Sequence, residues 1–222
     1  MNDYADAAVI DRTAARFARA AARRGTFHYV VSKLRRDPAM RAIASLGALG
    51  DILDLGCGRG LLSLYVLERG AAKSVRAYDW DAEKIALAQR ASEGLDAHFG
   101  TVDIREAEVE PADTVLLVDV LHYLGPAAQD ALLARAADLV RPGGRLVLRD
   151  ATTNCGWRSV FTLFVEWISM LVRFNLGESI ALRDVEGELV PQLEQKGFSC
   201  TVEPCREGTP FANVLLVATR PR

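Results

Sequence analysis

An acid and three glycines at alternate positions stand early in this sequence: Asp54, Gly56, Gly58 and Gly60. A largely apolar run at 51–55 leads into them, and a second apolar run at 61–67 follows. Glycine has no Cβ, so the backbone can turn sharply and lie against a ligand, while the start of the next helix offers unpaired N–H groups. The spacing therefore predicts a buried strand, a tight turn and a helix, with the turn forming part of a ligand site.

The glycine spacing disfavours a nicotinamide dinucleotide. A Gly-x-Gly-x-x-Gly pattern that starts at Gly56 needs glycine or alanine where Leu61 stands, and one that starts at Gly58 ends on Ser63. Asp54 also supplies a hydrogen-bond acceptor that a dinucleotide turn does not normally have at this place. We therefore disfavour a nicotinamide oxidoreductase.

A second acid, Asp79, ends the predicted strand at 74–78 and lies 19 residues beyond Gly60. Doubly wound folds place a carboxylate near this distance, where its two oxygens accept both ribose hydroxyls of a nucleoside cofactor. Capping of the helix at 82–91 is the alternative role for Asp79, and Asp81 could equally serve as that cap. Because the glycine turn and the acid occur together, we favour ribose binding.

The elements that must position these residues alternate between strand and helix, which predicts a parallel sheet with right-handed crossovers and helices on both faces. Ala-rich amphipathic helices fill the chain before the first strand. The predicted strands are 51–55, 74–78, 97–100, 114–118, 145–149, 199–203 and 213–219. The main predicted helices after the glycine turn are 82–91, 126–139, 157–174 and 183–196.

Asp-x-Gly-x-Gly-x-Gly at the end of a first strand resembles motif I of the class I S-adenosylmethionine (SAM)-dependent methyltransferases. Three later features are similar to the same family: the hexapeptide 119–124 resembles motif IV of its small-molecule members, Pro142-Gly143-Gly144 precedes the fifth strand, and Gly197-Phe198 leads into two final strands. The resemblance covers about residues 51–222. It implies an α/β, doubly wound, Rossmann-like sheet of seven strands, mostly parallel with an antiparallel C-terminal hairpin. Residues 1–49 would form a helical cap of the same domain, and residues 50–222 the SAM-binding methyltransferase domain.

The resemblance also implies SAM as the cofactor. The glycines would pass its methionine and ribose parts, Asp54 would hold the amino group through the loop or a water, and Asp79 would hold the ribose. Asp103 matches the acid that accepts the adenine amino group, although a turn or cap residue is an equal alternative. The implied cofactor-binding residues are Asp54, Gly56, Cys57, Gly58, Gly60, Asp79, Trp80, Asp103, Ile104 and Asp119.

Methyl transfer from a sulfonium is a direct displacement, so the protein chiefly has to align a nucleophile and exclude water. Asp119, His122 and Tyr123 would be nearest the acceptor, with His122 and Tyr123 as the candidate catalytic residues. The imidazole of His122 could take a proton from a phenol or enol oxygen near neutral pH. Shaping the pocket wall or stacking near the adenine is the alternative role for this ring.

Motif IV and its surroundings exclude several relatives. The Asn/Asp-Pro-Pro-Tyr sequence of adenine and glutamine amide methyltransferases is absent, as is the Pro-Cys nucleophile of the cytosine-C5 class. Catechol-type enzymes hold Mg²⁺ with an Asp-Asn pair that Asp150-Ala151 does not reproduce, so we expect no metal. The acceptor is expected to be an oxygen or an activated aromatic carbon of a small, aromatic or hydrophobic metabolite.

Two segments bear on the acceptor. The apolar helix at 157–174, with Trp157, Phe161 and Phe164, would be a lid or wall for a flat or hydrophobic substrate, with packing as plain core or weak membrane contact as alternatives. The segment 27–38 is loosely similar to methyltransferases of aryl-polyene and related polyketide pathways of secondary metabolism. That similarity implies an acceptor on an acidic carrier protein, bound by basic N-terminal helices that include Arg35, Arg36 and Arg41; a solvated basic face is the alternative.

The composition limits the class of protein, its compartment and its partners. The 222 residues are 50% hydrophobic with a net charge of −2, which predicts a globular chain with a sizeable core. Four cysteines without a Cys-x-x-Cys pair and an acidic start without a signal peptide favour a reducing cytoplasm. We expect no DNA partner and no transmembrane segment, and disfavour RNA because no RNA-binding module accompanies the domain. An RNA methyltransferase and a SAM-binding module without catalysis remain alternatives, as do a monomer and a homodimer.

Overall fold

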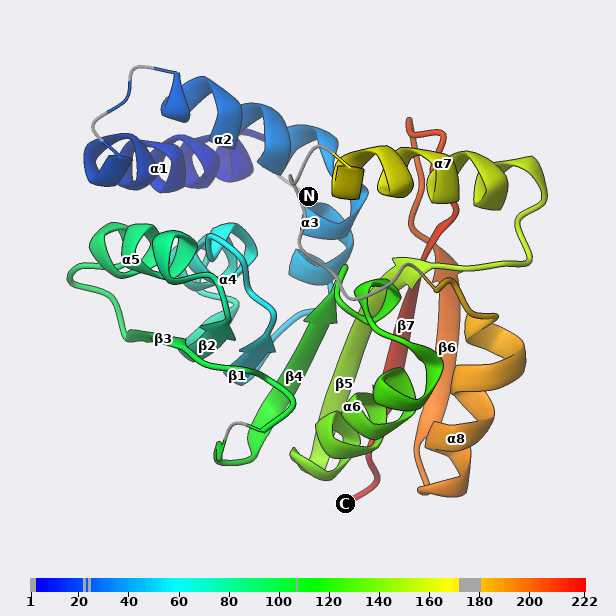
Figure 1. Cartoon of the computed structure of the whole chain (residues 1–222). Helices are drawn as coiled ribbons and strands as arrows, with labels where there is room; N and C mark the ends of the chain where they lie inside the picture. Colours follow the sequence, from blue (N-terminus) through cyan, green and yellow to red (C-terminus); the bar gives the residue numbers. More distant parts are fainter. Residues whose placement is uncertain (1–2, 22, 24, 107, 172–180) are drawn as a thin grey trace. The chain divides into compact units, whose positions relative to one another are not determined.

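The structure is a computed structural model that describes residues 3–21, 23, 25–106, 108–171 and 181–222 (Figure 1). The α-helices are α1 (Asp3–Ala21), α2 (Thr26–Arg36), α3 (Pro38–Ala44), α4 (Leu61–Glu68), α5 (Ala82–Ala91), α6 (Pro126–Asp138), α7 (Trp157–Leu171) and α8 (Val190–Gln195). A 3₁₀-helix, η1 (Leu121–Tyr123), and a π-helix, η2 (Val185–Leu189), complete the helical elements of the described residues. The strands are β1 (Gly50–Leu55), β2 (Ala72–Asp79), β3 (Ala97–Thr101), β4 (Ala112–Val118), β5 (Val140–Ala151), β6 (Ser199–Pro204) and β7 (Asn213–Thr219).

The strands follow the order β3-β2-β1-β4-β5-β7-β6 in a seven-stranded sheet. The sheet is mostly parallel, and its C-terminal strands are antiparallel, with β7 pairing antiparallel to both β5 and β6. The predicted doubly wound, Rossmann-like sheet with a C-terminal hairpin is therefore confirmed. The chain forms two compact units, residues 1–114 and 115–222.

In the first unit, β1 and β2 pair in parallel, as do β2 and β3. The side chains of Ile52, Leu53 and Leu55 are completely buried, so β1 is covered on both faces, as expected of a central parallel strand. The end of the unit returns to the start of β1, where the carboxylate of Asp113 accepts the N–H of Asp51 at 2.9 Å. This contact fixes the amino end of β1; at the carboxyl end, where the glycine turn begins, the N–H of Gly56 donates to Tyr78 O at 2.8 Å.

The N-terminal helices belong to this unit. Helices α1 and α2 lie side by side, and α1 also packs on α4 and α5 (Figure 1). Phe17 is buried, whereas Arg12 and Arg16 contact Glu68. The predicted amphipathic face therefore faces the helices that flank the glycine turn.

In the second unit, α6 and α8 pack together, α6 against β5 and α8 against β6 (Figure 1). Residues 153–171 leave the end of β5 and include α7, and the described chain resumes at residue 181. Thr152 and Arg183, which flank this stretch, form an isolated parallel bridge, so its two ends meet. The described residues 153–171 and 181–182 are called the α7 excursion below. Helix α7 is the apolar helix that the sequence places at 157–174, although residues 172–174 lie outside the described residues.

Element boundaries differ from the predictions at three places. Pro142-Gly143-Gly144, predicted as a turn before the fifth strand, lies inside β5, where Gly143 has φ +77° and donates its N–H to Arg220 O at 3.1 Å. The predicted helix at 183–196 starts at Val185 with a π-helical turn. The helix that begins at Pro38 ends at Ala44, earlier than expected. No described helix is long and apolar enough to cross a membrane.

Candidate functional site

The acid of the glycine motif, Asp54, is buried at the end of β1, with 3% of its surface exposed. Its carboxylate accepts a hydrogen bond from the hydroxyl of Ser63 on α4. Burial raises the pKa of Asp54 to about 7, the Ser63 hydrogen bond lowers it in part, and the negative charge of Asp79 raises it further. A bound cation would stabilise the ionised carboxylate, so the site suits a ligand with positive charge.

The glycine turn itself is held in the left-handed backbone region. At Gly58, φ is +54° and an added Cβ would meet no atom within 4 Å, so this side of the loop faces open space. At Gly60, φ is +70° and an added Cβ would lie 2.5 Å from a ring atom of Phe99. Gly60 is therefore required by packing, whereas Gly58 leaves room beside the loop for a ligand.

The second predicted acid, Asp79, organises the same loop. Its carboxylate accepts the N–H of Gly58 at 2.8 Å and the N–H of Asp81 at 2.9 Å. Asp81 caps α5 by accepting the N–H groups of Glu83 and Lys84. Asp81 is therefore the cap of α5, which was the alternative role considered for Asp79. Asp79 instead lies against the glycine turn.

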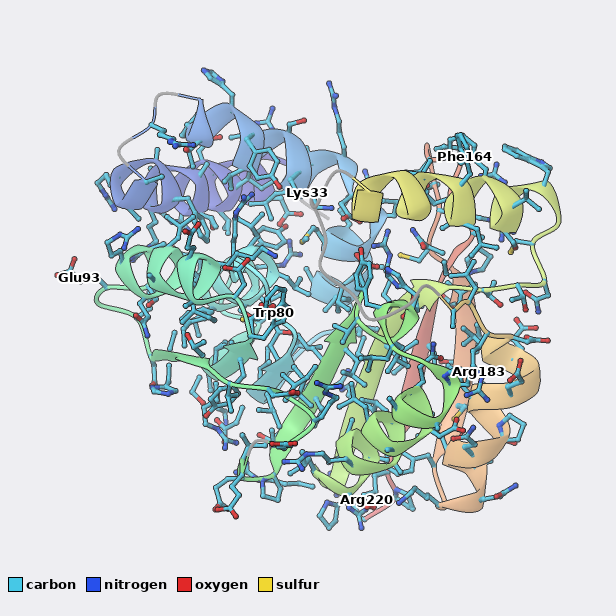
Figure 2. The ribbon with its side chains drawn as sticks, in the orientation of Figure 1. Lys33, Trp80, Glu93, Phe164, Arg183 and Arg220 are labelled. Carbon is cyan, nitrogen blue, oxygen red and sulfur yellow. The ribbon has the colours of Figure 1, made fainter. Side chains whose placement is uncertain are left out.

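The other predicted cofactor residues of the first unit lie around β2 and β3. Trp80 follows β2 with 53% of its surface exposed (Figure 2). Asp103 forms a forked pair with the guanidinium of Arg105, which lowers the pKa of that carboxyl, and Ile104 is half-buried. Burial raises the pKa of the Cys57 thiol well above its usual value. Asp103 would have to share its oxygens with Arg105 in order to accept an adenine amino group.

In the second unit, His122 is buried on η1 and its Nδ1 contacts a carboxylate oxygen of Asp150, at the end of β5. The other oxygen of Asp150 accepts the His122 backbone N–H at 3.2 Å. A carboxylate at Nδ1 favours the tautomer with its proton on that atom, which gives Nε2 the basic lone pair. The arrangement is that of a general base oriented by an acid.

Asp119 is the one described residue other than glycine with a positive φ, +58°. Its carboxylate pairs with the guanidinium of Arg149, which is buried, and its N–H donates to Arg149 O at 2.8 Å. A left-handed aspartate costs energy, and such conformations cluster at functional sites. The structure thus places Asp119 in a conformation that Arg149 holds.

Tyr123 lies next to the histidine, with the two ring centroids 4.0 Å apart. His122, Asp150 and Ala181 line a small cavity of about 10 Å³, measured as the space open to the centre of a water molecule. That volume is about what one water needs. Among the described residues, no group of three or more His, Cys, Asp or Glu side chains could hold a metal ion.

Comparison with known proteins identifies a methyltransferase domain. The family model described as a methyltransferase domain matches residues 52–144, which contain the glycine turn, Asp79 and the η1 segment. Residues 52–144 therefore form a class I SAM-dependent methyltransferase domain. A curated relative, carboxy-S-adenosyl-L-methionine synthase of Shewanella piezotolerans, is 31% identical over 106 residues, 45% of this chain and 43% of the relative. The chain thus spans less than half the length of that relative.

Two solved structures show the fold over most of this chain. An O-methyltransferase family protein from Burkholderia thailandensis aligns with a TM-score of 0.66 and 23% identity, covering 93% of this chain and 62% of the other. Magnesium protoporphyrin IX methyltransferase from Synechocystis PCC 6803, with bound SAH, aligns with a TM-score of 0.64 and 21% identity, covering 86% and 87%.

Within each unit the structure brings together residues that are separate in the sequence. In the first unit it joins Asp54, Asp79 and the glycines around one turn, as the sequence predicts. Within the second unit it joins His122 with Asp150, and Asp119 with Arg149. The sequence reading missed Ser63, Arg149 and the histidine-orienting role of Asp150. The available signal for Asp150 was its place at the end of β5, the strand next to β4, after which His122 follows.

Gly58→Val should abolish SAM binding in a folded protein, because the side chain fills the open space beside the turn. The left-handed backbone should cost about 1–2 kcal/mol of stability. Gly94→Val is the matched control, since Gly94 also has a positive φ, +78°, and open space around an added Cβ. Calorimetry should find SAM affinity lost only in the first variant, and equal affinity in both would refute the placement of the ligand.

Asp54 should make the folding free energy depend on pH. Its pKa of about 7 lies above the ordinary aspartate value of 3.8, so the native state binds more protons between these values and stability falls as pH rises from about 4 to 7. Asp54→Asn should remove that fall, which is on the order of 2–4 kcal/mol between pH 5 and 8 in urea titrations. Asp81→Asn is the control of opposite sign: although burial opposes it, hydrogen bonds from Lys84 and Glu83 lower the pKa of Asp81, so its stabilisation is lost as pH falls.

Proposed function

We propose that this protein transfers a methyl group from SAM to an oxygen, or an activated aromatic carbon, of a small aromatic or hydrophobic acceptor. The observation that carries the proposal is the buried His122–Asp150 pair, which forms an oriented base in the half of the chain that follows the cofactor motifs. A SAM-binding module without chemistry would have no use for such a base. An acceptor hydroxyl needs one if its proton is to leave near neutral pH.

The residues of the first unit fit the cofactor. The open space beside Gly58 leaves room for a ligand against the turn, and the buried carboxylate of Asp54 receives a hydroxyl hydrogen bond and would gain a positive counter-charge from a sulfonium ligand. Asp79 would accept ribose hydroxyls while it keeps the loop in place. When bound, SAM supplies a methyl group already activated on a positively charged sulfur.

The second unit would supply the proton chemistry. An acceptor oxygen that receives the methyl group would have to lose its proton as the new bond forms. His122 would take the acceptor proton at Nε2, and the Asp150 carboxylate would stabilise the imidazolium that results. Asp119, held by Arg149, would position the acceptor or the methionine end of the cofactor. Alignment of this kind can lower the barrier by roughly 7–11 kcal/mol.

The exposed face of α7 supports an apolar acceptor. Five of its large hydrophobic side chains are at least 36% exposed, and Phe164 projects from the helix in Figure 2. The opposite side of α7 is polar and anchored: Ser159 donates to Thr152 O at 2.7 Å, and Thr162 accepts the N–H of Ala212 at 3.0 Å. The five exposed side chains are Trp157, Val160, Phe161, Leu163 and Phe164. An apolar acceptor would remove this surface from water.

A carrier-bound acceptor has less support than a free small molecule. Several of the basic side chains that such a carrier would need are paired within the protein: Lys33 lies 2.6 Å from Asp37, Arg35 lies 3.7 Å from Asp11, and Arg12 and Arg16 share Glu68. These pairs reduce the positive potential that would attract an acidic carrier. We therefore place the free acceptor first.

His122→Ala should lower turnover about 10²–10⁴-fold while SAM affinity stays nearly unchanged, because the general base is lost and the cofactor contacts are not. Asp150→Asn should also lower turnover and shift the acidic limb of the pH–rate profile. The measurement is transfer of labelled methyl from SAM to a panel of phenols and enols, with binding followed by calorimetry. A loss below tenfold in His122→Ala would leave the ring no more than a positioning role, and bound SAM without transfer in wild type would favour the binding-module alternative.

Phe164→Ser should raise the KM for a hydrophobic acceptor about tenfold, with little change in stability, because the side chain is 58% exposed in the free protein. Leu163→Ser is the comparison on the same helix, since Leu163 lies at the edge of the exposed stripe. Steady-state kinetics with a hydrophobic and a polar acceptor would separate the effects. Equal KM values for wild type and Phe164→Ser would remove α7 from the acceptor site.

A further inference from the structure

The returning end of the α7 excursion is hydrogen-bonded to the backbone of the proposed base. Ala181, the first described residue after α7, donates its N–H to His122 O at 3.0 Å. The bridge between Thr152 and Arg183 follows two residues later, and Arg183 pairs with Asp130 on α6 at 2.6 Å. The segment 181–183 is thus fixed against η1 and α6 at the base of the excursion.

A single buried side chain on α6 joins these two segments. Gln129 has 1% of its surface exposed, and its Nε2 group has two N–H bonds to donate. One bond goes to Leu124 O at 2.9 Å, just after η1, and the other to Ala181 O at 2.7 Å. The carboxamide therefore spans from the histidine loop to the excursion, and both of its donors are used.

The same junction borders the water-sized cavity. Gln129, His122, Asp150 and Ala181 all line it, so the Gln129 carboxamide lies on the wall of the space next to the His122–Asp150 pair. Movement of Ala181 away from η1 would open that space to more water and would loosen the backbone that carries the imidazole. Both changes would alter the proton affinity of the base.

We propose that Gln129 is a positioning residue that couples the α7 excursion to His122. Its carboxamide holds Ala181 against the η1 segment, and the bridge between Arg183 and Thr152 joins that segment to Ser159 of α7, which donates to Thr152 O at 2.7 Å. An acceptor bound on α7 and the base that deprotonates it would thereby keep a fixed relation. This inference rests on the proposed function and deepens it by assigning the coupling to one side chain. Gln129 acts through hydrogen bonds to two backbone carbonyls and does not touch the reacting atoms.

The test compares Gln129→Met, which keeps the length of the side chain and removes both donors, with Lys196→Met. Lys196 is a matched control because its Nζ also donates to α6, to Asp138 at 2.7 Å, at the opposite end of the helix from Gln129. In Gln129→Met we expect kcat to fall about 10–100-fold, the fall expected when a reacting group is displaced by about 1 Å. SAM affinity should stay within about twofold, since the cofactor motifs lie elsewhere in the chain. The pKa that governs kcat should shift, and Lys196→Met should behave as wild type.

The rate of amide hydrogen exchange at Ala181 measures how often its hydrogen bond to His122 O opens, and this measurement does not depend on methyl transfer. It should be at least about tenfold faster in Gln129→Met than in wild type or Lys196→Met, because the hydrogen bond to His122 O would open more often. Faster exchange with unchanged kcat and pH profile would make Gln129 merely structural and overturn the proposal. Unchanged exchange would overturn it as well.

Failure of the proposed function and failure of the coupling by Gln129 give different results. If wild type bound SAM but transferred no methyl group to any acceptor, the proposed function would fail. The His122 imidazole pKa, measured by NMR in wild type and Gln129→Met, would then decide the coupling, which an equal pKa in both would refute. If Gln129→Met did not fold, Gln129→Asn takes its place, because its shorter side chain can reach at most one of the two carbonyls. Wild-type kcat, pH profile and exchange in that variant would overturn the proposal.

Discussion

Two buried side chains at the end of β5 determine the arrangement of the second unit. Arg149 and Asp150 are consecutive, so they leave the strand on opposite sides, yet each holds a residue of the segment that follows β4. Arg149 pairs with Asp119 and Asp150 with His122. Leaving one such buried charge without its partner commonly costs 3–5 kcal/mol, so neither residue of β5 can be lost cheaply. The positions of Asp119 and the imidazole follow from this strand end.

The first unit uses buried acids differently. Asp54 and Asp79 end neighbouring parallel strands, and the hydrogen bonds they accept come from a hydroxyl and from backbone N–H groups. Such donors stabilise a carboxylate less than a guanidinium does. Burial raises the pKa of Asp54, and the hydrogen bond from Ser63 offsets that rise only in part. A positively charged cofactor would complete this site, whereas the pairs of the second unit are already complete.

The sequence predicted the fold and the cofactor turn well because their signals are local. Strand and helix alternate along the chain, and Asp54 with its glycines occupies seven consecutive residues. The His122–Asp150 pair joins residues 28 apart, and Ser63 looks like any helix residue until α4 packs on β1. The Pro-Gly-Gly turn was misplaced because Gly143 and Gly144 form backbone hydrogen bonds with Arg220 and Pro221, beyond the end of β7, and these bonds extend β5 through residues whose local preference is to turn.

The pattern of α7 explains why its role could not be predicted from hydrophobicity. A stripe of apolar residues usually marks the buried face of a helix, but over residues 157–165 the large apolar side chains are exposed, whereas Ser159 and Thr162 are buried and hydrogen-bonded. These hydrogen bonds and a ring contact between Phe161 and Phe211, with centroids 6.0 Å apart, hold this part of the helix. If α7 binds the acceptor, as proposed, its exposed side chains can change without loss of the hydrogen bonds of Ser159 and Thr162. Acceptor preference can then vary independently of the glycine turn, which backbone geometry fixes.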